Sequence, residues 1–127
     1  MAKELHDKGL AVRKEVLGAD YVQRQLAAAD DFNKPLQELV TEYCWGWLWT
    51  RPQLPRKTRS LLNLALLSAL NRPTEFKAHV KGALKNGCSK EEIREVLLQV
   101  AVYCGVPAGV EAFRLAREVF SEGEKRA

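Results

Sequence analysis

The sequence contains no apolar run that approaches the ~20 residues a membrane-spanning helix needs. Residues 1–8 mix charges of both signs without the apolar segment of a secretory signal, so we expect a cytoplasmic protein. With two histidines and no Cys-x-x-Cys spacing, no zinc site is predicted, and the odd number of cysteines argues against a disulfide scaffold. We therefore expect Cys44, Cys88 and Cys104 to be reduced and mostly buried thiols.

No stretch of the chain shows the alternation of a β-strand, an internal repeat or a low-complexity tract. The net charge of +4 is spread among acidic residues, and Lys125-Arg126 is too short for a basic arm. Nucleic-acid binding is therefore not expected. The mild positive charge would help to attract an anionic substrate, but it is equally compatible with an ordinary solvated surface. At 127 residues, we predict a single domain, residues 1–127, with one core.

Apolar side chains recur at spacings of three and four nearly throughout, which predicts an all-α fold of six to seven helices. Glycines, prolines and capping residues indicate where the helices end. The expected helices cover 5–17, 21–29, 34–47, 56–71, 73–86 and 89–104, and a last helix, separated by Gly105 and Pro107, runs through about 122. Residues 56–71 are apolar almost all round, so we expect this helix to be central and buried.

The helix expected at 34–47 is amphipathic, and a loop with two prolines follows it. Its predicted apolar face consists of Leu36, Leu39, Val40, Tyr43, Cys44 and Trp47. Glu38 and Glu42 lie one turn apart on this helix, which fits either a solvated face or a polar site.

All three tryptophans, four arginines and His79 fall between residues 45 and 79. Because Trp45, Trp47 and Trp49 alternate, at least one should reach the surface. Burial in the core and at an oligomer interface explains them as well as lining a pocket does.

Arg56 and Arg59 begin a helix, where cations oppose the helix dipole. Either acidic partners or a bound anion would explain them, and Arg51 precedes them in the loop. His79 follows Glu75 by one helical turn and Arg72 by two, which fits either a general acid or base or a hydrogen-bonded residue at the helix edge.

Several motifs in this order extend along nearly the whole chain. They are Val12-Arg13-x-x-Val16-Leu17-Gly18, Asp31-Phe32-Asn33, Trp45-Gly46-x-x-Trp49-x-Arg51-Pro52, Thr58-Arg59-Ser60-Leu61, Asn71-Arg72 with His79, Asn86-Gly87 before Glu91-Glu92-Ile93, and Tyr103-Cys104-Gly105-x-Pro107-Ala108. With them the sequence resembles the carboxymuconolactone decarboxylase family. The resemblance implies the compact helical fold of the alkylhydroperoxidase D-like proteins and an obligate homo-oligomer, a trimer or a hexamer.

The redox proteins of the wider family carry a Cys-x-x-Cys-x-x-x-His site. Counted back from His79, Arg72 and Glu75 occupy the two cysteine positions here, so that disulfide chemistry is not expected at this site. The resemblance implies instead decarboxylation of 4-carboxymuconolactone to 3-oxoadipate enol-lactone and CO2, in protocatechuate catabolism by the β-ketoadipate pathway. The substrate is its own electron sink, so neither a metal nor an organic cofactor is expected.

The resemblance also suggests roles for individual residues. His79 would donate the proton, and Glu75 or Glu42 would orient it. Arg51 or Arg59 would hold the distal carboxylate. Arg72, Trp45 and Trp49 would complete the substrate site.

Three other interpretations stay open. The chain can act on a different small lactone or keto acid, or it can be a non-catalytic helical oligomer. A thiol peroxidase that uses Cys104 alone is the third.

Overall fold

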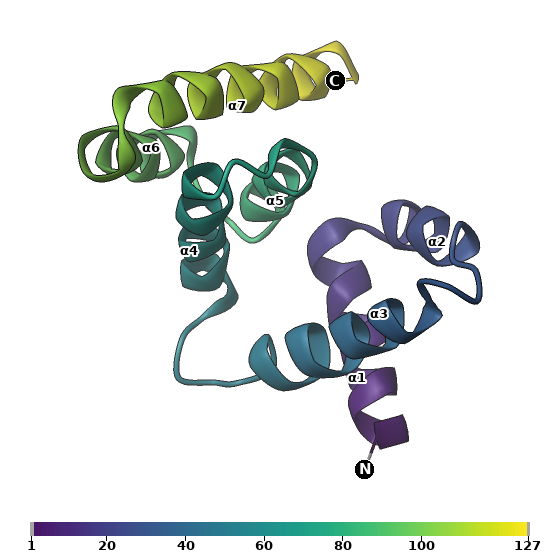
Figure 1. Ribbon diagram of the computed structural model, residues 1–127. Coiled ribbons are helices and arrows are strands. Elements are labelled where there is room, and N and C mark those ends of the chain that lie inside the picture. The colour runs from purple at the N-terminus through teal and green to yellow at the C-terminus, as the bar shows by residue number, and fades with distance from the viewer. Residues whose placement is uncertain (1, 127) are drawn as a thin grey trace. The chain divides into compact units, whose positions relative to one another are not determined.

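The computed structural model describes residues 2–126, the last of these without its side chain, and divides into two compact units, Met1–Pro55 and Arg56–Ala127 (Figure 1). The N-terminal unit contains α1 (Ala2–Leu17), α2 (Ala19–Ala27), α3 (Lys34–Leu39) and the π-helix η1 (Val40–Leu48), which continues α3. The C-terminal unit contains α4 (Arg56–Ala69), α5 (Pro73–Lys85), α6 (Lys90–Cys104) and α7 (Val106–Arg126). No strand occurs among the described residues, and the predicted all-α class is confirmed.

Local capping signals set the helix ends as the sequence predicts. Ser89 and Glu92 form a reciprocal capping box at the start of α6, and Pro73 occupies the first turn of α5. Gly18, Gly87 and Gly105 have φ angles of 97°, 91° and 115°, so each ends a helix in a conformation that an L side chain rarely adopts. The C-terminal helix extends to Arg126, a turn beyond its predicted end.

The apolar face predicted for residues 34–47 is wrong in part, and the backbone changes to a π-helix at Val40. The N–H of Trp49 bonds to the carbonyl of Cys44, five residues back, so a turn takes up more than the 3.6 residues of an α-helix. Thr41, Trp45 and Trp49 consequently line the buried side. Four residues of the predicted face, Leu36, Leu39, Tyr43 and Trp47, are exposed.

The backbones of α1 and η1 meet at two glycines. A Cβ on Gly9 would lie 1.9 Å from the carbonyl oxygen of Thr41, and one on Gly46 would lie 2.3 Å from that of Leu5. Neither position therefore accommodates a side chain at this helix crossing. Beside the crossing, Val12, Val16, Trp45 and Trp49 form the core of the N-terminal unit.

The core of the C-terminal unit is built from one face of each of its four helices. Its largest fully buried side chains are Leu64, Phe76, Ile93 and Leu97. The expectation that α4 is buried all round is wrong, because Leu62, Leu66 and Leu70 form an exposed stripe along it. An apolar pattern shows that a face avoids water but not whether the same chain covers it.

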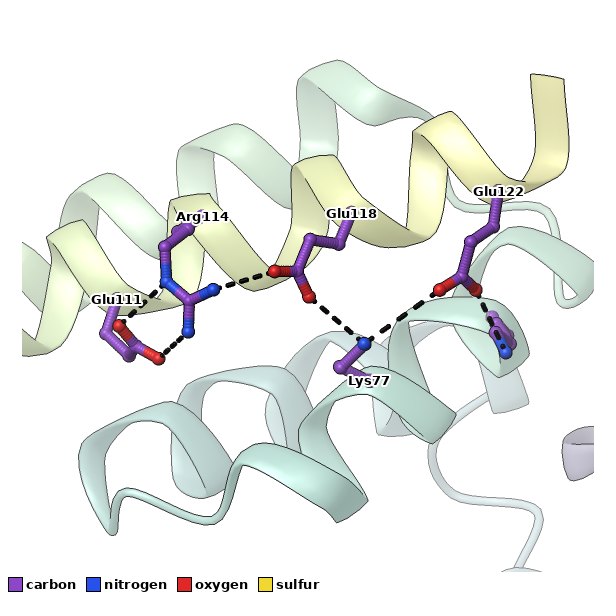
Figure 2. Close-up of polar contacts among 6 residues, drawn as sticks. Lys77, Glu111, Arg114, Glu118 and Glu122 are labelled. Carbon is purple, nitrogen blue, oxygen red and sulfur yellow. Dashed lines mark hydrogen bonds and ion pairs between the residues drawn. The ribbon is translucent and has the colours of Figure 1, made fainter. Parts of the chain in front are cut away.

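A chain of ion pairs joins α5 to α7 on the outside of this core (Figure 2). Lys77 Nζ lies 3.1 Å from a carboxylate oxygen of Glu118, and Lys81 Nζ lies 3.4 Å from one of Glu122. Arg114 donates to both Glu111 and Glu118 on α7 itself. Exposed ion pairs of this kind add little stability singly.

Within the described part of the chain, no helix is both long enough and apolar enough to cross a membrane.

We expect Gly9→Ala to destabilise the protein. The new methyl group forces α1 away from the Thr41 carbonyl, which should lower the free energy of unfolding by about 2 kcal/mol or more. Gly123→Ala is the matched control, because its Cβ meets no atom within 4 Å. The control should be neutral or stabilising by up to ~1 kcal/mol. Urea denaturation followed by circular dichroism measures both, and equal stabilities of the two variants would contradict the crossing.

Candidate active site

His79 lies in the middle of α5 and is 9% exposed. The neighbouring positions Phe76, Ala78, Val80 and Ala83 are buried with it, so the imidazole has lost most of its contact with water. Burial disfavours the charged ring and lowers the pKa of His79 to about 4. At neutral pH the ring is therefore an uncharged imidazole with one N–H donor and one acceptor nitrogen.

Arg59 lies in the first turn of α4 and is also 9% exposed. Its Nε is buried and has no hydrogen-bond partner among the described residues. A guanidinium that is nine-tenths buried with a donor left over is suited to receive a carboxylate from a ligand. The burial of Arg59 and its Nε, unpaired within the described part of the chain, therefore favour a bound anion as the reason why an arginine lies at the start of this helix.

The hydroxyl of Ser60 accepts a hydrogen bond of 2.9 Å from Nδ2 of Asn86, which ties the first turn of α4 to the end of α5. Asn86 is two helical turns, or about 10 Å, beyond His79 along α5. The bond therefore holds the first turn of α4, which carries Arg59, against the end of the helix that carries His79. No sequence pattern predicted this bond between Ser60 and Asn86.

Glu75 and Arg72 both lie on the exposed side at the start of α5. Burial is the cause of the lowered pKa of His79, and orientation of the ring by Glu75 stays a prediction. Arg72 Nη1 donates to the backbone carbonyl of Leu70 at 2.9 Å, and this bond holds its guanidinium against the α4–α5 turn.

Trp45 and Trp49 stack on each other in the N-terminal unit, with ring centroids 4.8 Å apart and planes inclined by 24°. Each is 3% exposed and packs with Val12 and Val16. Trp47 is exposed, which confirms that at least one tryptophan reaches the surface. The role of Trp45 and Trp49 as walls of a substrate site stays a prediction.

Arg51 and Glu42 are the other candidates in the N-terminal unit. The Arg51 guanidinium lies over the Trp47 ring, 4.9 Å from its centroid, and stays exposed. This stacking orients the guanidinium while its N–H groups remain open to an anion. Glu42 is half-buried on η1, next to the fully buried Thr41.

Arg13 is a buried charge that the sequence analysis did not select. Its Nη1 donates to Gln37 at 3.0 Å and to Thr41 at 3.2 Å, so it anchors α1 to α3 and η1. A signal was available, because Gly9, Val12 and Val16 place position 13 on the buried stripe of α1.

All three cysteines are free thiols, but they are not mostly buried as expected. Cys88 is buried, Cys44 is half-buried and Cys104 is exposed. Burial raises the pKa of the Cys44 and Cys88 thiols, which keeps them protonated at neutral pH. Among residues 2–126, no three His, Cys, Asp or Glu side chains gather closely enough to hold a metal ion.

The low pKa of His79 has a consequence for stability that can be measured. Below pH ~6.5 the unfolded chain binds a proton at this ring, whereas the folded chain binds it only near pH 4. Between these values unfolding takes up a proton, so the free energy of unfolding falls as the pH falls. From pH 6.5 to 5 the wild type should lose about 2 kcal/mol more than His79→Gln does.

Urea titrations at several pH values test this difference, and the ring proton shifts of His79 in NMR spectra test the pKa directly. His6→Gln assigns the signals of the two histidines. Parallel stability curves, or an NMR midpoint near 6.5, would show that the ring is not desolvated.

Comparison with known proteins gives matches that span both units. The model of the carboxymuconolactone decarboxylase family matches residues 34–118. A nitrosuccinic acid decarboxylase of Metarhizium robertsii is 44% identical over 120 residues, which cover 94% of this chain and 84% of the relative.

A 4-carboxymuconolactone decarboxylase of Acinetobacter baylyi is 41% identical over 120 residues, 94% of this chain and 90% of the relative. A protein of the same name from Pseudomonas putida is 41% identical over 44 residues, which cover 35% of this chain and 92% of the relative. The family match covers most of the chain, and two relatives align with nearly all of it. The chain therefore belongs to the carboxymuconolactone decarboxylase family.

Proposed function

We propose that this protein decarboxylates 4-carboxymuconolactone to 3-oxoadipate enol-lactone and CO2, in protocatechuate catabolism by the β-ketoadipate pathway. The observation that carries the proposal is the 41% identity, over 94% of the chain, to a 4-carboxymuconolactone decarboxylase. The site supports it with a buried neutral imidazole and a buried guanidinium in one unit. The proposed setting is the cytoplasm.

The reaction needs little beyond positioning and one proton. The bond between the γ ring carbon and its carboxylate breaks, and CO2 leaves. The electron pair moves through the ring double bond and forms a dienolate at the lactone carbonyl. A proton then adds at the α carbon and gives the enol-lactone. The substrate thus accepts its own electrons, and we propose that no metal or organic cofactor takes part.

Arg59 is suited to hold the carboxylate of the acetate arm, which stays on the product. Its buried Nε has no partner among the described residues, so a carboxylate can satisfy it with a charge-assisted hydrogen bond. The Ser60–Asn86 hydrogen bond supports this role, because it ties the turn that carries Arg59 to the helix that carries His79. Arg51 on its tryptophan is the alternative anchor.

His79 is proposed to deliver the proton. In the free protein the ring is neutral, because burial lowers its pKa to about 4. A dianionic substrate beside the ring favours the charged form and raises that pKa, so the ring binds a proton when the substrate binds. The imidazolium then donates to the α carbon as the dienolate forms. Orientation of the ring by Glu42 or Glu75 stays a prediction.

A second candidate substrate is nitrosuccinic acid, because the 44% identical relative is named for its decarboxylation. Nitrosuccinic acid is also a dicarboxylate, and its nitro group can accept the electrons that CO2 leaves behind. One carboxylate would again be held while the other leaves and a proton is delivered to carbon. The same residues therefore serve either substrate.

We also propose that the protein assembles as a homo-oligomer, a trimer or a hexamer. Large apolar side chains are exposed in both units, more than a soluble monomer usually shows. They include Phe32, Leu66, Val102, Tyr103 and Val110.

The first test measures CO2 release and enol-lactone formation from enzymatically generated 4-carboxymuconolactone in the presence of a metal chelator, with nitrosuccinic acid assayed in parallel. We expect turnover well above the spontaneous rate, with kcat/KM higher for the lactone, and no effect of the chelator. A higher kcat/KM for nitrosuccinic acid would assign the chain to the second candidate. If the protein accelerates neither reaction, the proposed activity is overturned, and the family membership describes the fold alone.

His79→Ala should lower kcat by about 100- to 10,000-fold, the usual contribution of a general acid, while the fold is retained. Arg59→Gln should raise KM more than it lowers kcat, because it removes binding of a group that does not react. His6→Ala and Arg94→Gln are the matched controls and should keep wild-type kinetics. A wild-type kcat in His79→Ala, with folding confirmed by circular dichroism, would remove His79 from the mechanism.

A further inference from the structure

Phe32 is the most exposed large apolar side chain of the described residues, at 93%. The turn that carries it is tightly held. Asp30 accepts hydrogen bonds of 3.1 Å from the backbone N–H groups of both Phe32 and Asn33, and Asn33 accepts one of 2.7 Å from the N–H of Asp30. Because the turn is already ordered, the ring can dock elsewhere at little further cost in backbone entropy.

A groove of about 750 Å³ runs along the outer face of α7. Its first half is apolar and is formed by Ala101 on α6 with Val106, Val110 and Phe113 on α7. Val106 and Val110 are exposed there, which is unfavourable without a partner. The floor is shaped by Gly109, where a Cβ would lie 2.5 Å from that of Ala101, so α6 and α7 pack without a side chain between them.

The second half of the groove is charged, and only some of its charged side chains form ion pairs. Arg114 is held by Glu111 and Glu118, while Lys77 and Lys81 engage Glu118 and Glu122 (Figure 2). Arg117 and Lys125 also line the groove, and neither forms an ion pair with the residues that the structure describes. The groove therefore offers an apolar pocket next to unpaired positive charge.

The turn at Phe32 presents the complementary pattern. Its aromatic ring projects from a segment that carries Asp30 and Asp31, and both carboxylates are exposed. Asp31 forms no ion pair within residues 2–126. An aromatic anchor flanked by acidic groups matches an apolar groove flanked by basic groups in both hydrophobicity and charge.

We infer that Phe32 of one copy of this chain inserts into the α7 groove of a second copy, with Asp31 facing Arg117. Each chain has both the projecting ring and the groove, so the contact is heterologous and can close into a ring of copies. The inference rests on the homo-oligomer proposed above and names the surface that holds it together. It is independent of the substrate.

Sedimentation or light scattering of the full chain, over a wide range of protein concentration, tests the contact. We expect the wild type to be oligomeric and Phe32→Ser to dissociate at least about thirtyfold more readily, as for the loss of an interface hot spot. Because Phe32 is exposed in the single chain, circular dichroism should show the variant folded.

Charge reversal gives a second, independent readout. Asp31→Arg and Arg117→Asp should each weaken assembly, and the double variant should recover much of it, because the pair is restored with opposite sign. Arg94→Asp, an exposed reversal on α6 outside the groove, is the matched control and should assemble like the wild type.

A monomeric wild type would overturn both the oligomer and this contact while leaving the decarboxylase proposal standing. An oligomeric wild type with Phe32→Ser unchanged would overturn the contact alone and assign the groove to another occupant. A double reversal no better than the single variants would likewise overturn it.

Discussion

Burial of basic side chains is the constraint on which both units depend. Water stabilises a cation strongly, so a buried one must find oxygens nearby or give up its proton. Arg13 finds the oxygens of Gln37 and Thr41, and these bonds join α1 to the helix that carries the tryptophans. His79 has an apolar setting and becomes neutral. Arg59 keeps a buried donor for which the described residues provide no acceptor.

The same constraint makes the C-terminal unit suited to dicarboxylates. In the free protein, burial disfavours the charged form of the His79 imidazole. Two carboxylates reverse this preference, because each negative charge stabilises one positive group. We propose that substrate binding and protonation of His79 are coupled in this way, so that the proton donor forms when the substrate binds.

Most of the fold could be predicted because its signals are local. Gly18, Pro73, Gly87 and the Ser89–Glu92 box act within one turn of the chain, and the structure confirms each. The π-helix could not be predicted from a 3.6-residue period, because its turns take up more residues than that period assumes. The exposure of Leu66 could not be predicted for a different reason. The hydrophobicity of a helix face does not show whether the same chain or another molecule covers it.

The candidate site could likewise be predicted only in part from the sequence. The resemblance suggested His79 and Arg59, and both prove to be buried, but the sequence alone could not foresee that burial makes the imidazole neutral. Arg72 and Glu75, at the positions of the redox cysteines, are exposed in the first turn of α5, whereas His79 lies one turn further in, among apolar side chains. Without the two cysteines this site cannot form a disulfide, but the histidine can still bind and release one proton. Loss of CO2 onto an electron acceptor requires one proton in return, and we propose that His79 supplies it.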